Sequence, residues 1–199
     1  MKSIVLIDFD GVIRQWPGNE VSQAEAVLGI SQGALYSCAF STELLNLAVC
    51  GEISHQQWCD RVTEQLARHW GEEAAAQLVK IWNQAEWFID TPLIEGIRRH
   101  TPESKLVLVT NGTSQLEADL ASVALQDSFD LVVSSSHIGV AKPDRLFFEI
   151  ALQLAGGNPV NAVFIDDSEA NVAAAKAMGI DSHVYCNCDD ALAFVREHF

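Results

Sequence analysis

The order of apolar and polar residues divides the chain into two kinds of segment. Beyond residue 93, short apolar runs alternate with segments of helical period, and another apolar run starts at Ile4. Strands are predicted in that first run and at 106–110, 131–134, 162–165 and 182–185. Helices are predicted at 114–125, 143–155 and about 169–178, with a last helix ending near His198. Strands that alternate with helices predict an α/β core, in which a parallel sheet is covered on both faces.

The stretch from Glu20 to about Phe88 has a different pattern, because it contains no convincing strand. Ala, Leu, Gln, Glu and Trp recur there at helical spacing, and Ser54 is placed to cap a helix. Pro92 is expected at a hinge where the chain returns to the core. We therefore expect an α/β core formed by residues 1–13 and 93–199, with a helical cap inserted at 14–92.

Composition and charge exclude several kinds of partner. The chain has 199 residues, of which 49% are hydrophobic, and its net charge is −15. Nucleic-acid binding needs a basic face, so no nucleic-acid partner is expected. No apolar run approaches the ~20 residues of a membrane span, so no membrane partner is expected either. The five scattered cysteines fit reduced thiols, and the first apolar run is typical of a strand rather than a secretory signal. Both features favour a cytoplasmic protein.

Polar residues follow the predicted strands. Because the carboxyl ends of parallel strands meet at one edge of a sheet, these residues are expected to share one crevice. They are Asp8, Asp10, Thr110, Asn111, Lys142, Asp166 and Asp167. Clustered carboxylates are tolerable only around a cation, and hard oxygen ligands suit Mg²⁺. A hydroxyl, backbone N–H groups beside glycine and a lysine ammonium suit a phosphoryl group.

With these motifs in this order, the chain resembles the haloacid dehalogenase-like hydrolase superfamily, in its phosphatase form with a helical cap after the first strand. The resemblance implies a Rossmann-like three-layer core. It also implies that Asp8 is the nucleophile and Asp10 the general acid and base. Thr110, with Asn111 beside it, and Lys142 match the phosphate-binding positions of the family.

The same resemblance implies a bound Mg²⁺ and a small phosphorylated metabolite, such as a sugar phosphate, as the substrate. The metal is expected on Asp8, the backbone carbonyl of Asp10 and the pair Asp166 and Asp167. Asp167 is favoured as the direct ligand, whereas Asp166 binds either directly or through water. The protein is expected to be a monomer or a homodimer.

Alternatives to a phosphatase remain open at this point. A phosphomutase would use the same phosphorylated Asp8, and a non-catalytic phosphometabolite-binding protein would keep the same scaffold. A dehalogenase is disfavoured, because halide leaves without a proton and needs no acid such as Asp10. Arg14 and Trp16 follow the nucleophile closely enough to face the substrate, although a hinge or packing role fits them equally well. His55 is expected on a solvated helix face.

Overall fold

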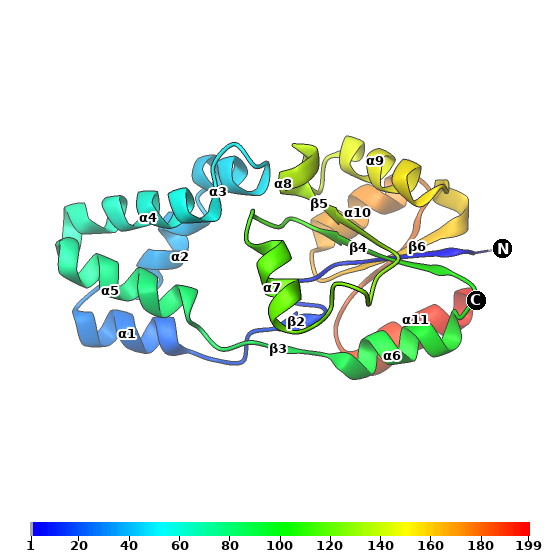
Figure 1. The fold of residues 1–199 in the computed structure, drawn as a ribbon, viewed down its shortest axis with the longest axis horizontal. Helices are drawn as coiled ribbons and strands as arrows, with labels where there is room; N and C mark the ends of the chain where they lie inside the picture. Colours follow the sequence, from blue (N-terminus) through cyan, green and yellow to red (C-terminus); the bar gives the residue numbers. More distant parts are fainter. Residues whose placement is uncertain (1) are drawn as a thin grey trace.

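The computed structural model describes residues 2–199, so residue 1 of the predicted core lies outside it, and it contains a five-stranded parallel sheet (Figure 1). In the spatial order β5-β4-β1-β6-β7, the strands are Leu131–Ser134, Lys105–Thr110, Ile4–Ile7, Ala162–Asp166 and Asp181–Val184. The central strand β1 lies between β4 and β6 and is parallel to both, with Ile7 opposite Leu108 and Ile165. The α/β prediction is confirmed, and the end of β1 is flanked by the ends of two strands distant in sequence.

Helices cover both faces of this sheet. In β1, Val5 and Ile7 face one side, and Ile4 and Leu6 face the other, as the two-residue period of a strand requires. Helices α6 (Thr91–His100), α7 (Leu116–Ser122) and α11 (Cys188–His198) pack on the first side. Helices α9 (Arg145–Ala155) and α10 (Glu169–Ala177) pack on the second, and α8 (Ser135–Ile138) follows β5. The result is the three-layer, Rossmann-like arrangement.

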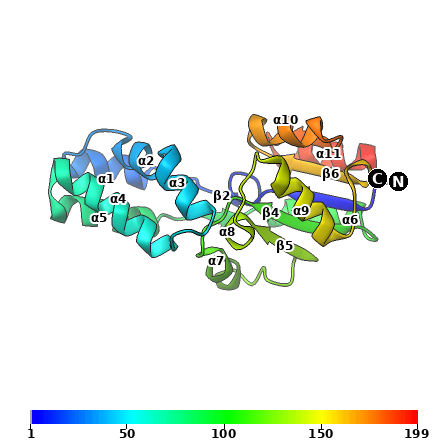
Figure 2. The ribbon, with the colours of Figure 1, turned by 90° about the horizontal axis from the view of Figure 1, so that it is seen from above.

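The helical stretch forms a separate group of helices at one end of the molecule (Figures 1 and 2). Its five helices are α1 (Glu20–Leu28), α2 (Ala34–Ala39), α3 (Thr42–Val49), α4 (His55–Trp70) and α5 (Glu72–Asn83). They enclose their own apolar cluster, in which Leu35, Val62 and Leu78 are fully buried. Ser54 caps α4 through a reciprocal pair of bonds with Gln57, which confirms the predicted helix start.

The two chain segments between the helical group and the sheet pair with each other. β2 (Arg14–Gln15) and β3 (Phe88–Ile89) are antiparallel strands, each of two residues. Such strands are too short to produce a recognisable period, and the sequence did not predict them. Pro92, expected at a hinge, instead lies in the first turn of α6, where its missing N–H costs no helical hydrogen bond. The side chain of Asp90 caps that helix by accepting from the backbone N–H of Leu93, at 3.1 Å.

No helix among residues 2–199 has both the length and the apolar character that crossing a bilayer requires.

Candidate active site

Three neighbouring strands deliver the predicted residues to one edge of the sheet. Asp8 directly follows β1, Thr110 ends β4, and Asp166 ends β6. The backbone N–H of Asp8 donates to the carbonyl of Ile165 at 3.0 Å, which fixes Asp8 beside the end of β6. Strand pairing thus brings together side chains that are more than 100 positions apart in sequence.

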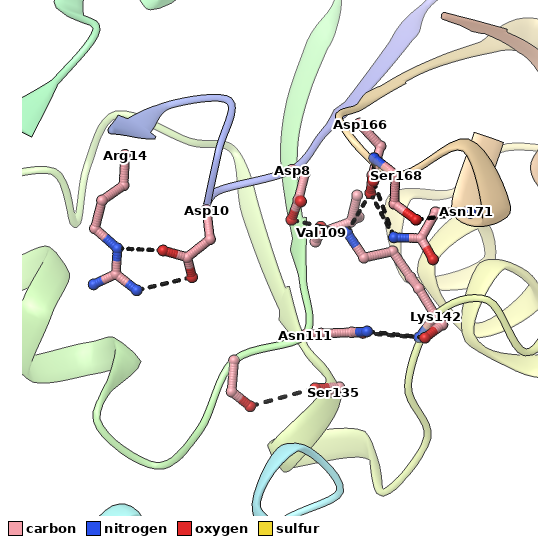
Figure 3. A network of polar contacts seen from close by, with 11 residues as sticks. Asp8, Asp10, Arg14, Val109, Asn111, Ser135, Lys142, Asp166, Ser168 and Asn171 are labelled. Atoms are coloured by element: carbon pink, nitrogen blue, oxygen red, sulfur yellow. Dashed lines mark hydrogen bonds and ion pairs between the residues drawn. The ribbon is translucent and has the colours of Figure 1, made fainter. Parts of the chain in front are cut away.

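Lys142 joins the two buried carboxylates. Its Nζ lies 2.8 Å from Asp8 Oδ1 and 2.6 Å from Asp166 Oδ2, and it donates to the carbonyl of Val109 at 2.9 Å (Figure 3). Burial alone would lower the pKa of Lys142, but the charges of Asp8 and Asp166 outweigh burial and raise that pKa. The ammonium therefore stays charged between the two acids.

Two asparagines hold this arrangement in place. Asn171, at the start of α10, donates to both oxygens of Asp166, at 2.9 and 3.1 Å. The backbone N–H of Ser168 also donates to Asp166, at 2.8 Å. Asn111 accepts from the backbone N–H of Lys142 and donates to its carbonyl, both at 2.8 Å. The Asn111 side chain therefore positions the lysine loop through both ends of its amide. Asn171 was not predicted as a site residue, because an asparagine in a first helical turn is common.

Negative charge exceeds positive charge at this edge. Oxygens of Asp8, Asp166 and Asp167 lie within 4.8 Å of one another. Burial, and then the charge of Asp166, raise the pKa of Asp8 to about 7 against the opposing effect of Lys142. The same two causes, in the same order, raise the pKa of Asp167. With one ammonium among three carboxylates, this donor set fits a divalent cation bound by oxygen ligands.

Gly11 makes room for the exposed member of this cluster. A Cβ at Gly11 would lie 2.2 Å from Asp167 Oδ2, and the backbone φ of +80° lies in the left-handed region that favours glycine. Any other residue there would force the Asp167 carboxylate to move from its present position. The glycine of the Asp-x-Asp-Gly motif thus has a steric role in the acidic cluster.

Asp10 lies apart from the other acids. Its carboxylate is bound by Arg14, with Nε to Oδ1 at 2.6 Å and Nη2 to Oδ2 at 2.8 Å. Figure 3 shows both side chains at a distance from the Lys142 cluster. Among the described residues, the compact acidic group contains Asp8, Asp166 and Asp167 but not Asp10. Asp8, Asp166 and Asp167 therefore lie together at the sheet edge, as expected for acids that follow neighbouring strands, whereas the side chain of Asp10 does not join them.

The helical group touches the sheet edge next to Thr110. The ring of His55, the first residue of α4, contacts Thr113 Oγ1 at 3.0 Å on one side and Asn83 Oδ1 at 3.0 Å on the other. Its backbone N–H donates to Ser114 Oγ at 2.9 Å. His55 is thus a contact to the core, whereas the sequence favoured a solvated face. A helical period cannot reveal which neighbour a helix start will meet.

Comparison with known proteins gives a family and a fold. A sequence model of the haloacid dehalogenase-like hydrolases matches residues 2–179. Over 143 residues the chain is 32% identical to the haloacid dehalogenase-like hydrolase domain-containing protein 3 of Bos taurus, covering 66% of this chain and 56% of that protein. Over 72 residues it is 38% identical to the pyrimidine 5′-nucleotidase YjjG of Escherichia coli K12, covering 35% and 32%. The match thus spans about a third to just over half of these relatives.

A solved structure matches almost the whole chain. The enzyme bt-2542 of Bacteroides thetaiotaomicron, solved as the wild-type protein with magnesium and inorganic phosphate, superposes with a TM-score of 0.74 at 19% identity. The superposition covers 94% of this chain and 95% of that one. At this identity the likeness establishes the fold.

Proposed function

The chain belongs to the haloacid dehalogenase-like hydrolases, and from that membership we propose that it is a Mg²⁺-dependent phosphatase of small phosphorylated metabolites, such as a sugar phosphate. One observation carries the proposal: the Lys142 ammonium lies between Asp8 and Asp166, with a third carboxylate unpaired beside them. Asp8, at the end of the central strand, is thereby buried and held in one orientation. The negative charge of the three carboxylates exceeds the positive charge of the one ammonium, which leaves a place for a divalent cation. A nucleophilic carboxylate that must approach a phosphate dianion needs these conditions.

The proposed reaction has two steps, and Asp10 gives up a proton in the first and regains one in the second. First, a carboxylate oxygen of Asp8 bonds to phosphorus, the bond from phosphorus to the leaving oxygen breaks, and Asp10 gives that oxygen its proton. Second, water attacks the phosphorus of the aspartyl-phosphate and gives a proton to Asp10, while the bond from phosphorus to the Asp8 oxygen breaks. Inorganic phosphate leaves, the Asp8 carboxylate is restored and Asp10 is protonated again. The hydroxyl of Thr110 and the backbone N–H of Asn111 would donate to the phosphoryl oxygens, and the ammonium of Lys142 would supply positive charge beside them.

The residues that would hold Mg²⁺ are Asp8, Asp167, the backbone carbonyl of Asp10 and, directly or through water, Asp166. The ion would supply positive charge against the phosphoryl oxygens. Both oxygens of Asp166 already accept hydrogen bonds, from Lys142, Asn171 and Ser168. Asp167 is exposed and enters none of the ion pairs found among residues 2–199. This contrast supports Asp167 as the direct ligand.

The relatives support the phosphoester class. One is named a pyrimidine 5′-nucleotidase, and the enzyme bt-2542 was solved with magnesium and inorganic phosphate. The carboxyl at Asp10 also favours a leaving group that needs a proton, which halide does not. In this proposal the cap spans residues 14–92 and the core spans residues 1–13 and 93–199. The cap would cover the substrate and exclude bulk water.

A phosphate-release screen tests the proposal. Purified protein with Mg²⁺ is incubated with a panel of phosphorylated sugars, nucleotides and other metabolites, with and without EDTA. We expect Mg²⁺-dependent release from at least one compound, and loss of at least 10³-fold in Asp8→Asn, because the nucleophile is gone. Asp127→Asn removes an exposed carboxylate outside the site and is the matched control.

Three outcomes would contradict the proposal. Formation of a sugar-phosphate isomer without net phosphate release would identify a phosphomutase. Tight binding of a phosphometabolite that Asp8→Asn retains, without turnover in either protein, would identify a binding protein. Turnover that is equal in Asp8→Asn and the wild type would exclude Asp8 as the nucleophile.

A further inference from the structure

Arg14 is a buried cation that the proposed reaction does not use. It lies in β2, between the helical group and the sheet, and only 9% of its surface is exposed. Its guanidinium carbon lies 4.6 Å from the ring centre of Phe9, 4.9 Å from that of Trp16 and 5.3 Å from that of Trp87. Aromatic rings thus cover the guanidinium, as in cation–π contacts.

The edges of the same guanidinium are occupied by two carboxylates. Besides its bidentate pair with Asp10, Arg14 donates from Nη1 to Asp119 Oδ2, at 2.5 Å. Asp119 lies on α7, so this bond anchors the guanidinium to the core. Two carboxylates on its edges and aromatic rings around it thus surround the guanidinium of Arg14. The contacts of Arg14 are therefore with Asp10, Asp119 and aromatic rings, which indicates a role inside the protein.

Asp10 is held from two sides. Arg14 bonds both of its oxygens, and the indole Nε1 of Trp16 donates to Oδ1 at 3.1 Å. We call Arg14 and Trp16 together the Asp10 clamp. Both residues follow the nucleophile loop in the segment that leads into the helical group. The clamp turns the carboxyl toward this segment and away from Asp8 (Figure 3).

We propose that the Asp10 clamp is a pair of positioning residues that keeps the carboxyl of Asp10 withdrawn, so that the clamp must open before a proton reaches the leaving oxygen. This inference rests on the proposed phosphatase function. Three hydrogen bonds to the two oxygens of Asp10 orient its carboxyl toward Arg14 and Trp16 while the clamp is closed. The Asp119 carboxylate, which accepts a hydrogen bond from Arg14 Nη1, would still compensate the charge of Arg14 once Asp10 turns away.

The position of the clamp connects it to the helical group. Trp16 precedes α1 and Trp87 precedes β3, and their ring centres are 6.3 Å apart across the two connecting segments. Arg14 packs against both indoles. A shift of the helical group would therefore alter the surroundings of Asp10 without moving Asp8, which the sheet holds. The orientation of the Asp10 carboxyl would then depend on the position of the helical group.

A pair of matched probes measures how far proton delivery limits the reaction. Phenyl phosphate and p-nitrophenyl phosphate have similar shapes, but phenoxide is the stronger base and needs a proton more. The value of kcat/KM covers binding and transfer to Asp8 and excludes the later hydrolysis. A change in the ratio of kcat/KM for phenyl phosphate to that for p-nitrophenyl phosphate therefore measures a change in proton delivery to the leaving oxygen.

Trp16→Phe is the sharpest variant, because it keeps a ring over Arg14 and removes one hydrogen bond to Asp10. We expect this ratio to rise about three- to tenfold, since a weaker clamp leaves the working orientation of Asp10 more populated. Arg14→Lys, which replaces a two-point contact by a single ammonium, is expected to raise the ratio at least as much. Trp87→Phe alters the other indole over Arg14, which is no donor to Asp10 in the described structure, and should leave the ratio unchanged.

Each other outcome counts against the clamp. If the ratio falls in Trp16→Phe and Arg14→Lys, these residues hold Asp10 in its working orientation and the proposal is overturned. If kcat/KM falls equally for both probes, their role is structural only, and the proposal is overturned as well. If the ratio is unchanged in an active enzyme, the phosphatase stands and the clamp does not. A wild-type protein that hydrolyses neither probe nor any metabolite in the panel refutes the phosphatase and the clamp together.

Discussion

Asp8 and Asp10 are two positions apart in sequence, yet they lie in regions of opposite character. The side chain of Asp8 is 10% exposed and is held by Lys142, against the ends of three hydrogen-bonded strands. The side chain of Asp10 is 43% exposed and is held by Arg14 and Trp16, in the segment that leads to the helical group. A rigid sheet edge suits the group that forms a bond to phosphorus, whereas a group that must move a proton twice benefits from an attachment outside the sheet. We call the surroundings of Asp8 the rigid region and those of Asp10, formed by Arg14 and Trp16, the connecting region.

The largest expected effect comes from removing the ammonium at the rigid edge. In Lys142→Met, Asp8 and Asp166 would face each other without a counter-charge, and we expect a loss of about 3–5 kcal/mol in the free energy of unfolding at pH 8. Activity should fall on the order of 10³-fold, because the transferred group loses its cation. Denaturant unfolding and initial rates measure the two losses. Lys176→Met, at an exposed position in α10, is the control, and equal stability of the two variants would mean that Lys142 is not the centre of the site.

A smaller and more selective effect is expected in the connecting region. In Asp10→Asn, we expect kcat/KM for phenyl phosphate to fall about 10²-fold and that for p-nitrophenyl phosphate to fall much less, because only the first leaving group depends on the acid. The free energy of unfolding should change by less than about 1 kcal/mol, since Arg14 keeps Asp119 as a partner. A loss of stability as large as that of Lys142→Met would erase the distinction between the two regions.

The rigid region is also the part that the sequence predicts well. Alternation in β1 and the order of strands and helices imply that Asp8 and Asp166 meet at one sheet edge, and the structure places them on either side of Lys142. Strand ends are predictable because short, continuous apolar runs stop where the chain leaves the core. The confirmed strand boundaries lie within one residue of those predicted at 106–110, 131–134, 162–165 and 182–185.

The side-chain contacts of the connecting region could not be predicted in the same way. The direction of the Asp10 side chain depends on Arg14, Trp16 and Asp119, and the last of these is more than 100 positions away. No local pattern links an arginine after the first strand to an aspartate on α7. Likewise, the contact of His55 with Thr113 depends on how the helical group is seated on the core. Side-chain contacts between separately folded parts leave little trace in the periodicity of either part.

The smallest effect expected is a pH-dependent response to Mg²⁺ at the rigid edge. Burial raises the pKa of Asp8 from 3.8 to about 7, so the folded protein holds a proton that the unfolded chain releases near pH 4. Between these values the unfolded state binds fewer protons, and the stability of the metal-free protein therefore falls as pH rises through this window. Mg²⁺ must displace the same proton, so its affinity should rise with pH up to about 7 and then level off.

The melting temperature with and without Mg²⁺ measures this response. At saturating Mg²⁺ we expect a rise of about 2–4 °C at pH 8, and a much smaller rise at pH 5.5, since ligand binding to the folded state stabilises it by mass action. Asp8→Asn removes the titrating carboxyl, so its response should be weak and nearly independent of pH, whereas Asp10→Asn should respond like the wild type because its backbone carbonyl is unchanged. A pH-dependent response that survived in Asp8→Asn and vanished in Asp10→Asn would place the metal in the connecting region. The division of roles between the two regions would then be wrong.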